Sequence, residues 1–210
     1  MEEEEVEEDA QAVPSMVLVL SSLLERVVER NDAAVAVGLR PLPDRTAAFH
    51  SVRKPDISAR RYLERIFRYA NCSPSCYAVA YIYLLRFLHR HPAVALHSLN
   101  LHRFLIAAVL AAVKFTEDIH YNNAYFAKLG GISLIEMNYL EVDFLFGLGF
   151  ELNVTPATFS SYCSILQREF YLESPPPSKL HCYITEEESN CCQQKHSASS
   201  QQVFWAYRLH

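Results

Sequence analysis

The chain has 210 residues, of which 50% are hydrophobic, and its formal net charge is −5. This length and apolar content can fill one sizeable core, and a count of only 5 glycines favours a helical protein. The acidic residues concentrate in residues 2–9, and no cluster of lysine and arginine is long enough to follow a phosphate backbone. We therefore expect no nucleic-acid partner.

The apolar runs are too short for a membrane helix, because a span needs about 20 consecutive apolar residues. The sequence begins MEEEEVEED, which has the opposite charge to the start of a signal peptide. We therefore expect no membrane partner and an intracellular protein, in the nucleus, the cytoplasm or both. Six cysteines in such a protein are more typical of free thiols than of a disulfide framework.

Catalytic and metal motifs are missing from the sequence. It contains neither the glycine-rich phosphate loops nor the serine elbow of hydrolases nor the paired histidines of zinc proteases. Cys72 and Cys76, and the cysteines and histidines near the C-terminus, have spacings that match no standard zinc site. We expect no enzyme activity, no metal and no cofactor.

An acidic tail, residues 1–13, is the first of four predicted parts. Residues 14–54 hold an N-terminal helix and a connector. In that helix, MVLVLSSLLERVVERN, apolar residues recur at helical spacing until Asn31, which we expect to end it. Residues 55–172 form the compact domain. Residues 173–210 lack a sustained apolar period and are expected to be a flexible tail.

The compact domain contains six predicted helices. Ser73 followed by Pro74 is an N-cap signal, and Ser133 with Glu136 is a capping box. Gly130 and Gly131, just before Ser133, end a short helix. The predicted helix ranges are 57–69, 74–91, 99–117, 122–129, 133–148 and 156–172. The expected fold class is all-α, a bundle of five core helices with flanking N- and C-terminal helices and disordered tails.

Two helices of the domain each carry one charge where their pattern calls for an apolar residue. The central helix contains FLIAAVLAAVKF, in which Lys114 is the only charge and Phe115 is expected to be buried. In the next long helix, positions 134, 137, 144, 145 and 148 are apolar and expected to be buried, and Glu141 falls into the stripe that 134, 137, 144 and 148 form. Lys114 and Glu141 can form a structural ion pair, or they can lie at a groove rim and bind backbone groups of a partner. The pattern alone does not choose between the two.

Three segments resemble the cyclin box: AAVKFTED, YNNAYFAKLGGIS and LEVDFLFGLGFELNVTP. Together with the helix order they are most similar to the single-box P- and U-type plant cyclins. The resemblance implies a five-helix cyclin box and a non-catalytic subunit that binds and activates a cyclin-dependent kinase, of the A-type or the phosphate-signalling type. It also implies a role in cell-cycle or nutrient-linked regulation. Lys114 and Glu141 match the family's lysine–glutamate pair, which contacts the kinase beside its αC helix.

Two positions depart from the family pattern. Leu85 stands where an aspartate usually precedes an arginine, and Val113 stands where a smaller residue precedes the lysine. Without this carboxylate, Arg60 or Arg61 is expected to lack an ion-pair partner. A helical adaptor of the same fold that activates no kinase is the alternative function.

Overall fold

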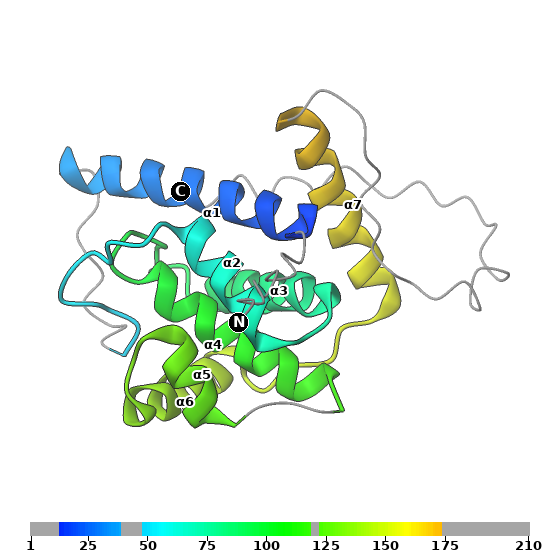
Figure 1. The fold of residues 1–210 in the computed structure, drawn as a ribbon. Helices are drawn as coiled ribbons and strands as arrows, with labels where there is room; N and C mark the ends of the chain where they lie inside the picture. Colours follow the sequence, from blue (N-terminus) through cyan, green and yellow to red (C-terminus); the bar gives the residue numbers. More distant parts are fainter. Residues whose placement is uncertain (1–12, 39–47, 119–121, 174–210) are drawn as a thin grey trace, which may run out of the picture.

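The protein is described from a computed structural model, which describes residues 13–38, 48–118 and 122–173 (Figure 1). Within these ranges the chain forms helices and no strand, so the predicted all-α fold is confirmed. Apart from residues 13 and 173, the predicted tails lie outside the described residues, as does part of the connector. None of the described helices is both long and apolar enough to cross a membrane. The helices are α1 (Ser15–Ala36), α2 (Ala59–Ala70), α3 (Pro74–Arg90), α4 (Leu101–Thr116), α5 (Asn123–Gly130), α6 (Leu134–Leu148) and α7 (Pro156–Glu173).

Helix α4 lies at the centre of the bundle, as its sequence predicts. It packs against α2, α3, α5 and α6, and its apolar residues from Phe104 to Val113 are buried. Small alanine side chains within α4 allow these neighbours to approach closely. The prediction that Phe115 is buried is wrong, because its side chain is 51% exposed. Phe115 lies in the last turn of α4, on a side that the neighbouring helices leave exposed.

Helices α1 and α7 flank the bundle. In Figure 1, α1 crosses the top of the molecule, α7 stands at its upper right, and α5 and α6 lie at the bottom. Helix α1 packs against α2, α3 and α7. The prediction that Asn31 ends α1 is wrong, because the helix continues to Ala36. The Asn31 amide is buried and donates a 2.8 Å hydrogen bond to the carbonyl of Leu96, so its polar group is satisfied without ending the helix.

Several helix ends follow the predicted cap signals. Ser133 and Glu136 form the capping box of α6, and Gly131 ends α5 with a φ of 69°. Helix α3 begins at Pro74 as expected, but the side chain of Ser73 makes no cap hydrogen bond. It donates instead to the carboxylate of Glu117, at 2.6 Å. This bond ties the start of α3 to the end of α4.

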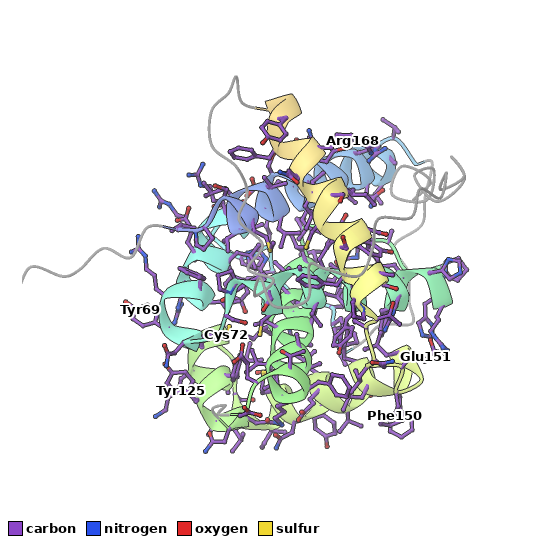
Figure 2. The ribbon with its side chains drawn as sticks, turned by 90° about the vertical axis from the view of Figure 1, so that its right-hand side faces the viewer. Tyr69, Cys72, Tyr125, Phe150, Glu151 and Arg168 are labelled. Atoms are coloured by element: carbon purple, nitrogen blue, oxygen red, sulfur yellow. The ribbon has the colours of Figure 1, made fainter. Side chains whose placement is uncertain are left out.

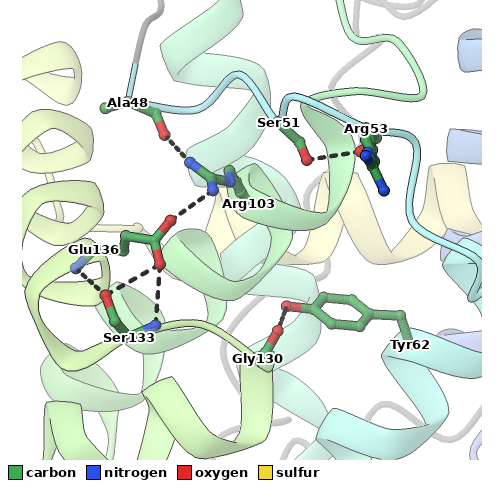
Figure 3. Close-up of polar contacts among 8 residues, drawn as sticks. All are labelled: Ala48, Ser51, Arg53, Tyr62, Arg103, Gly130, Ser133 and Glu136. Carbon is green, nitrogen blue, oxygen red and sulfur yellow. Dashed lines mark hydrogen bonds and ion pairs between the residues drawn. The ribbon is translucent and has the colours of Figure 1, made fainter.

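Arg103 fixes α6 relative to α4 (Figure 3). Its guanidinium group lies 2.7 Å from Oε1 of Glu136 and donates to the carbonyl of Ala48 at 2.8 Å. Because Glu136 also belongs to the capping box, Arg103 of α4 holds the first turn of α6 in place. The ion pair therefore connects α4 to the first turn of α6.

The buried side of α6 differs in part from the predicted stripe. Met137, Phe144 and Leu148 are buried as expected, and Leu140 joins them. Leu145, which was also expected to be buried, is half-buried against the core. The prediction that Leu134 belongs to this side is wrong, because Leu134 is 46% exposed. Leu134 is the first residue of α6, where the helix has not yet reached the core. Glu141 lies at the edge of the buried side.

Candidate functional site

The structure brings Lys114 and Glu141 together. Lys114 lies in the last turn of α4, Glu141 lies midway along α6, and Lys114 Nζ is 2.6 Å from Glu141 Oε1. The side chains are 30% and 15% exposed, so both remain within reach of a partner at the surface. Lys114 also sits at a helix C-terminus, where the helix dipole favours a cation. This geometry agrees with both interpretations that the sequence left open.

A third residue, Asn123 of α5, completes the site. Its Nδ2 donates to Glu141 Oε2 at 2.6 Å and to Asn138 Oδ1 at 2.8 Å. Each carboxylate oxygen of Glu141 is therefore held by a different helix, one by α4 and the other by α5. Asn123 is not singled out by its sequence pattern, although YNN stands at the start of this short helix. Its role depends on how α5 packs against α6, which periodicity does not specify.

Glu117 holds the end of α4 close to the site. Its Oε1 accepts hydrogen bonds from the Ser73 amide at 3.0 Å and from the Cys76 thiol at 3.0 Å, in addition to the Ser73 hydroxyl. Burial alone would raise the pKa of Glu117, but the hydrogen bonds from Cys76 and Ser73 outweigh it and lower that pKa. The carboxylate therefore stays charged at neutral pH. It fixes the α4 terminus three residues beyond Lys114.

A row of exposed apolar side chains runs along the outer side of α6. Ile135, Tyr139, Val142 and Phe146 are 68%, 65%, 47% and 68% exposed, and we call these four residues the α6 stripe. Their spacing of four, three and four residues places them on one side of the helix. Val142 follows Glu141 directly, so the stripe borders the ion pair.

Further exposed aromatic side chains extend this surface. Phe150 follows the end of α6, is 57% exposed, and its ring centroid lies 5.1 Å from that of Phe146. Figure 2 labels Phe150 at the lower edge of the molecule. Phe115 adds a second exposed aromatic ring next to Lys114. Exposed apolar side chains grouped along one helix are typical of an interaction site.

The α6 stripe was also missed from the sequence, although its signal was present. Positions 135, 139, 142 and 146 show helical spacing in the segment LIEMNYLEVDFLFGL. A second stripe of positions on the same helix was assigned to the core. A helix with apolar residues on two sides is expected to be covered on both sides. The core covers only one side of α6, so the pattern indicates a partner on the other.

Comparison with known proteins identifies the family. The cyclin family model matches residues 14–152, which include α1 to α6. The chain belongs to the cyclin family. It is 60% identical to Cyclin-P4-1 of Oryza sativa subsp. japonica, over 88% of this chain and 90% of the relative. It is 55% identical to Cyclin-U4-1 of Arabidopsis thaliana, over 80% of this chain and 82% of the relative.

More distant plant cyclins match over a similar share of the chain. Cyclin-U1-1 of Arabidopsis thaliana is 40% identical over 77% of this chain and 76% of the relative. The predicted resemblance to P- and U-type cyclins is therefore confirmed. Cyclins are non-catalytic regulators of protein kinases, and membership in this family implies a cyclin-dependent kinase as partner.

Leu85 has different neighbours from those that the family comparison suggested. It lines a pocket together with Arg26 and Arg30 of α1 and Glu169 of α7. Arg60 pairs instead with Glu64 on its own helix, at 2.9 Å. The arginines that share a pocket with position 85 therefore come from α1, whereas Arg60 and Arg61 were expected.

Proposed function

We propose that this cyclin binds a cyclin-dependent kinase with the surface formed by the end of α4 and the outer side of α6, and that binding activates the kinase. The α6 stripe is the observation that carries this proposal. Ile135, Tyr139 and Phe146 are each at least 65% exposed, although they lie on an ordered helix with a well-packed inner side. Burial of these side chains against a partner helix is favourable by roughly 25 cal/mol for each Å² of apolar surface.

Lys114 and Glu141 supply the polar contacts of the proposed interface. An ammonium group has three donors, and each carboxylate oxygen can accept more than one hydrogen bond. Lys114 can therefore donate to backbone carbonyls of the kinase, and Glu141 can accept from its backbone amides. Contacts with the main chain fasten the partner without demanding particular partner side chains. The ion pair and Asn123 hold both groups in position before binding.

Activation would follow from the position of the kinase αC helix. A protein kinase needs an ion pair between a lysine of its third strand and a glutamate of αC before it transfers phosphate. A rigid apolar surface that packs on αC favours the inward position, in which this ion pair forms. The chemistry then belongs entirely to the kinase. The proposed partner is an A-type or phosphate-signalling-type kinase, in cell-cycle or nutrient-linked regulation in the nucleus or cytoplasm.

A reconstitution experiment tests this function. The purified cyclin is mixed with each candidate kinase, and stoichiometric binding and phosphorylation of a peptide substrate are measured separately. The proposal predicts a 1:1 complex with higher kinase activity than the kinase alone. Binding without activation would favour the helical adaptor instead. Absence of binding to every candidate kinase would contradict the proposal.

A further inference from the structure

A pocket of about 330 Å³ lies between α1, α3 and α7. In Figure 1, α1 and α7 lie at the top of the molecule, whereas α6 lies at the bottom. Half-buried apolar side chains line the pocket, among them Leu23 and Val27 of α1, Leu85 of α3 and Ile165 of α7. This volume is at the lower end of the roughly 300–1,000 Å³ that is typical of ligand pockets. It suits a few apolar side chains.

Two arginines give the pocket a positive rim. Arg26 is bound to Glu169, with 3.2 Å between Nη2 and Oε2, and Glu169 is only 3% exposed. Arg30 lies one turn further along α1, is exposed, and forms no ion pair with any residue that the structure describes. Two guanidinium groups against one carboxylate leave a net positive charge. The pocket therefore fits an occupant in which apolar side chains lie next to acidic ones.

The chain itself contains such a sequence after α7. Residues 180–188 read LHCYITEEE, in which Leu180, Tyr183 and Ile184 precede three consecutive glutamates. We propose that residues 180–188 bind in the pocket between α1, α3 and α7, with Tyr183 or Ile184 inside it and the glutamates at Arg30. The other apolar segment of the C-terminal region, VFWAY at 203–207, contains no acidic residue and matches the rim less well.

The connection is long enough for this contact. Glu169 lines the pocket, and α7 ends four residues later at Glu173, which is a distance of about 6 Å along the helix axis. Ser174 is followed by three prolines, which cannot continue the helix. Residues 174–182 can span up to about 30 Å when extended. Since the segment is tethered, its effective concentration at the pocket is of millimolar order, so even a weak contact is populated.

Hydrogen exchange on the full-length chain tests the proposal. The amides of residues 183–188 should exchange about tenfold or more slowly than in a free peptide of the same sequence. Arg30→Glu should return them to within about twofold of the peptide rate, because it reverses the charge at the rim. The double change Tyr183→Ser and Ile184→Ser should do the same. Arg61→Glu, an equally exposed position on α2, is the matched control and should leave the protection unchanged.

A charge swap makes the test specific. Arg30→Glu combined with Glu186→Lys, Glu187→Lys and Glu188→Lys should restore the protection. Exchange of residues 183–188 at the peptide rate in the wild-type chain would overturn the proposal. So would protection that survives both Arg30→Glu and the double serine change, or protection confined to 203–207. Circular dichroism of each variant confirms that the folded domain is intact, and kinase binding through the α6 stripe is expected to be unaffected.

Discussion

Asn123 Nδ2 lies 2.6 Å from Glu141 Oε2, the carboxylate oxygen that Lys114 does not contact. Glu141 is thus held from both sides, by α4 and by α5. Each of its oxygens still has a free lone pair, since one carboxylate offers about four acceptor positions. A partner amide can therefore bind Glu141 without breaking the ion pair.

Asn123→Ala should weaken kinase binding by about threefold to tenfold, because Glu141 would lose one of the two groups that orient it. Asn123 acts here as a positioning residue. The dissociation constant is measured together with Asn122→Ala, which removes the neighbouring N-cap of α5 and serves as the control for a general disturbance of that helix. Equal losses in the two variants would show that Asn123 acts only through the fold of α5.

Phe146→Ser should weaken kinase binding by about tenfold or more, because a 68% exposed aromatic ring of the α6 stripe would be lost from the interface. Its effect on stability should stay within about 0.5 kcal/mol, as is usual for exposed positions. Val37→Ser is the matched control, since Val37 is 69% exposed at the end of α1. Unchanged kinase affinity of Phe146→Ser would place the kinase elsewhere.

Leu148→Ala should destabilise the domain by about 2–5 kcal/mol, because Leu148 is completely buried on the inner side of α6. Leu134→Ala, on the same helix but 46% exposed, should have a much smaller effect. Chemical denaturation of the two variants measures the difference. Equal midpoints would show that the inner side of α6 is not part of the core.

Leu85→Asp should lower the melting temperature. The corresponding loss in the free energy of unfolding is about 1–3 kcal/mol. The new carboxylate would replace an apolar side chain in a pocket that already holds the Glu169 carboxylate, to which Arg26 is bound. Arg30 also lines this pocket, but it is exposed, so water and salt screen its charge. Leu85→Asn is the control, because it changes polarity without adding charge, and it should be less destabilising. A higher melting temperature for Leu85→Asp would reveal a vacant ion-pair site.

The sequence predicted the features that local chemistry determines. Caps placed α6 at Ser133 and ended α5 at Gly131, and a charge in an apolar pattern singled out Lys114 and Glu141. Features that depend on a distant partner were missed. Asn31 resembles a helix stop until its bond to Leu96 is known, and Asn123 is an ordinary polar residue until α5 packs on α6.

The two sides of α6 show the same limit. Leu134 belongs to the predicted stripe but is 46% exposed, whereas Leu140 lies outside that stripe and is buried. Periodicity detects that a side of a helix is apolar. It does not state whether the protein itself or a partner covers that side.

We propose that Lys114 and Glu141 are the residues that fasten the kinase. Lys114→Ala and Glu141→Ala are compared with Arg60→Ala, which removes a surface ion pair on α2. Partly exposed ion pairs contribute about 0–1 kcal/mol to stability, so all three variants should melt close to the wild type.

Melting temperature and kinase affinity, measured on the same preparations of these variants, separate a role in kinase binding from a role in folding. Loss of one partner of a desolvated charge pair weakens binding by about 2–5 kcal/mol, so Lys114→Ala and Glu141→Ala should raise the dissociation constant by roughly thirtyfold or more. Arg60→Ala should leave it unchanged. Folded Lys114→Ala and Glu141→Ala variants that bind and activate the kinase as the wild type does would contradict the account.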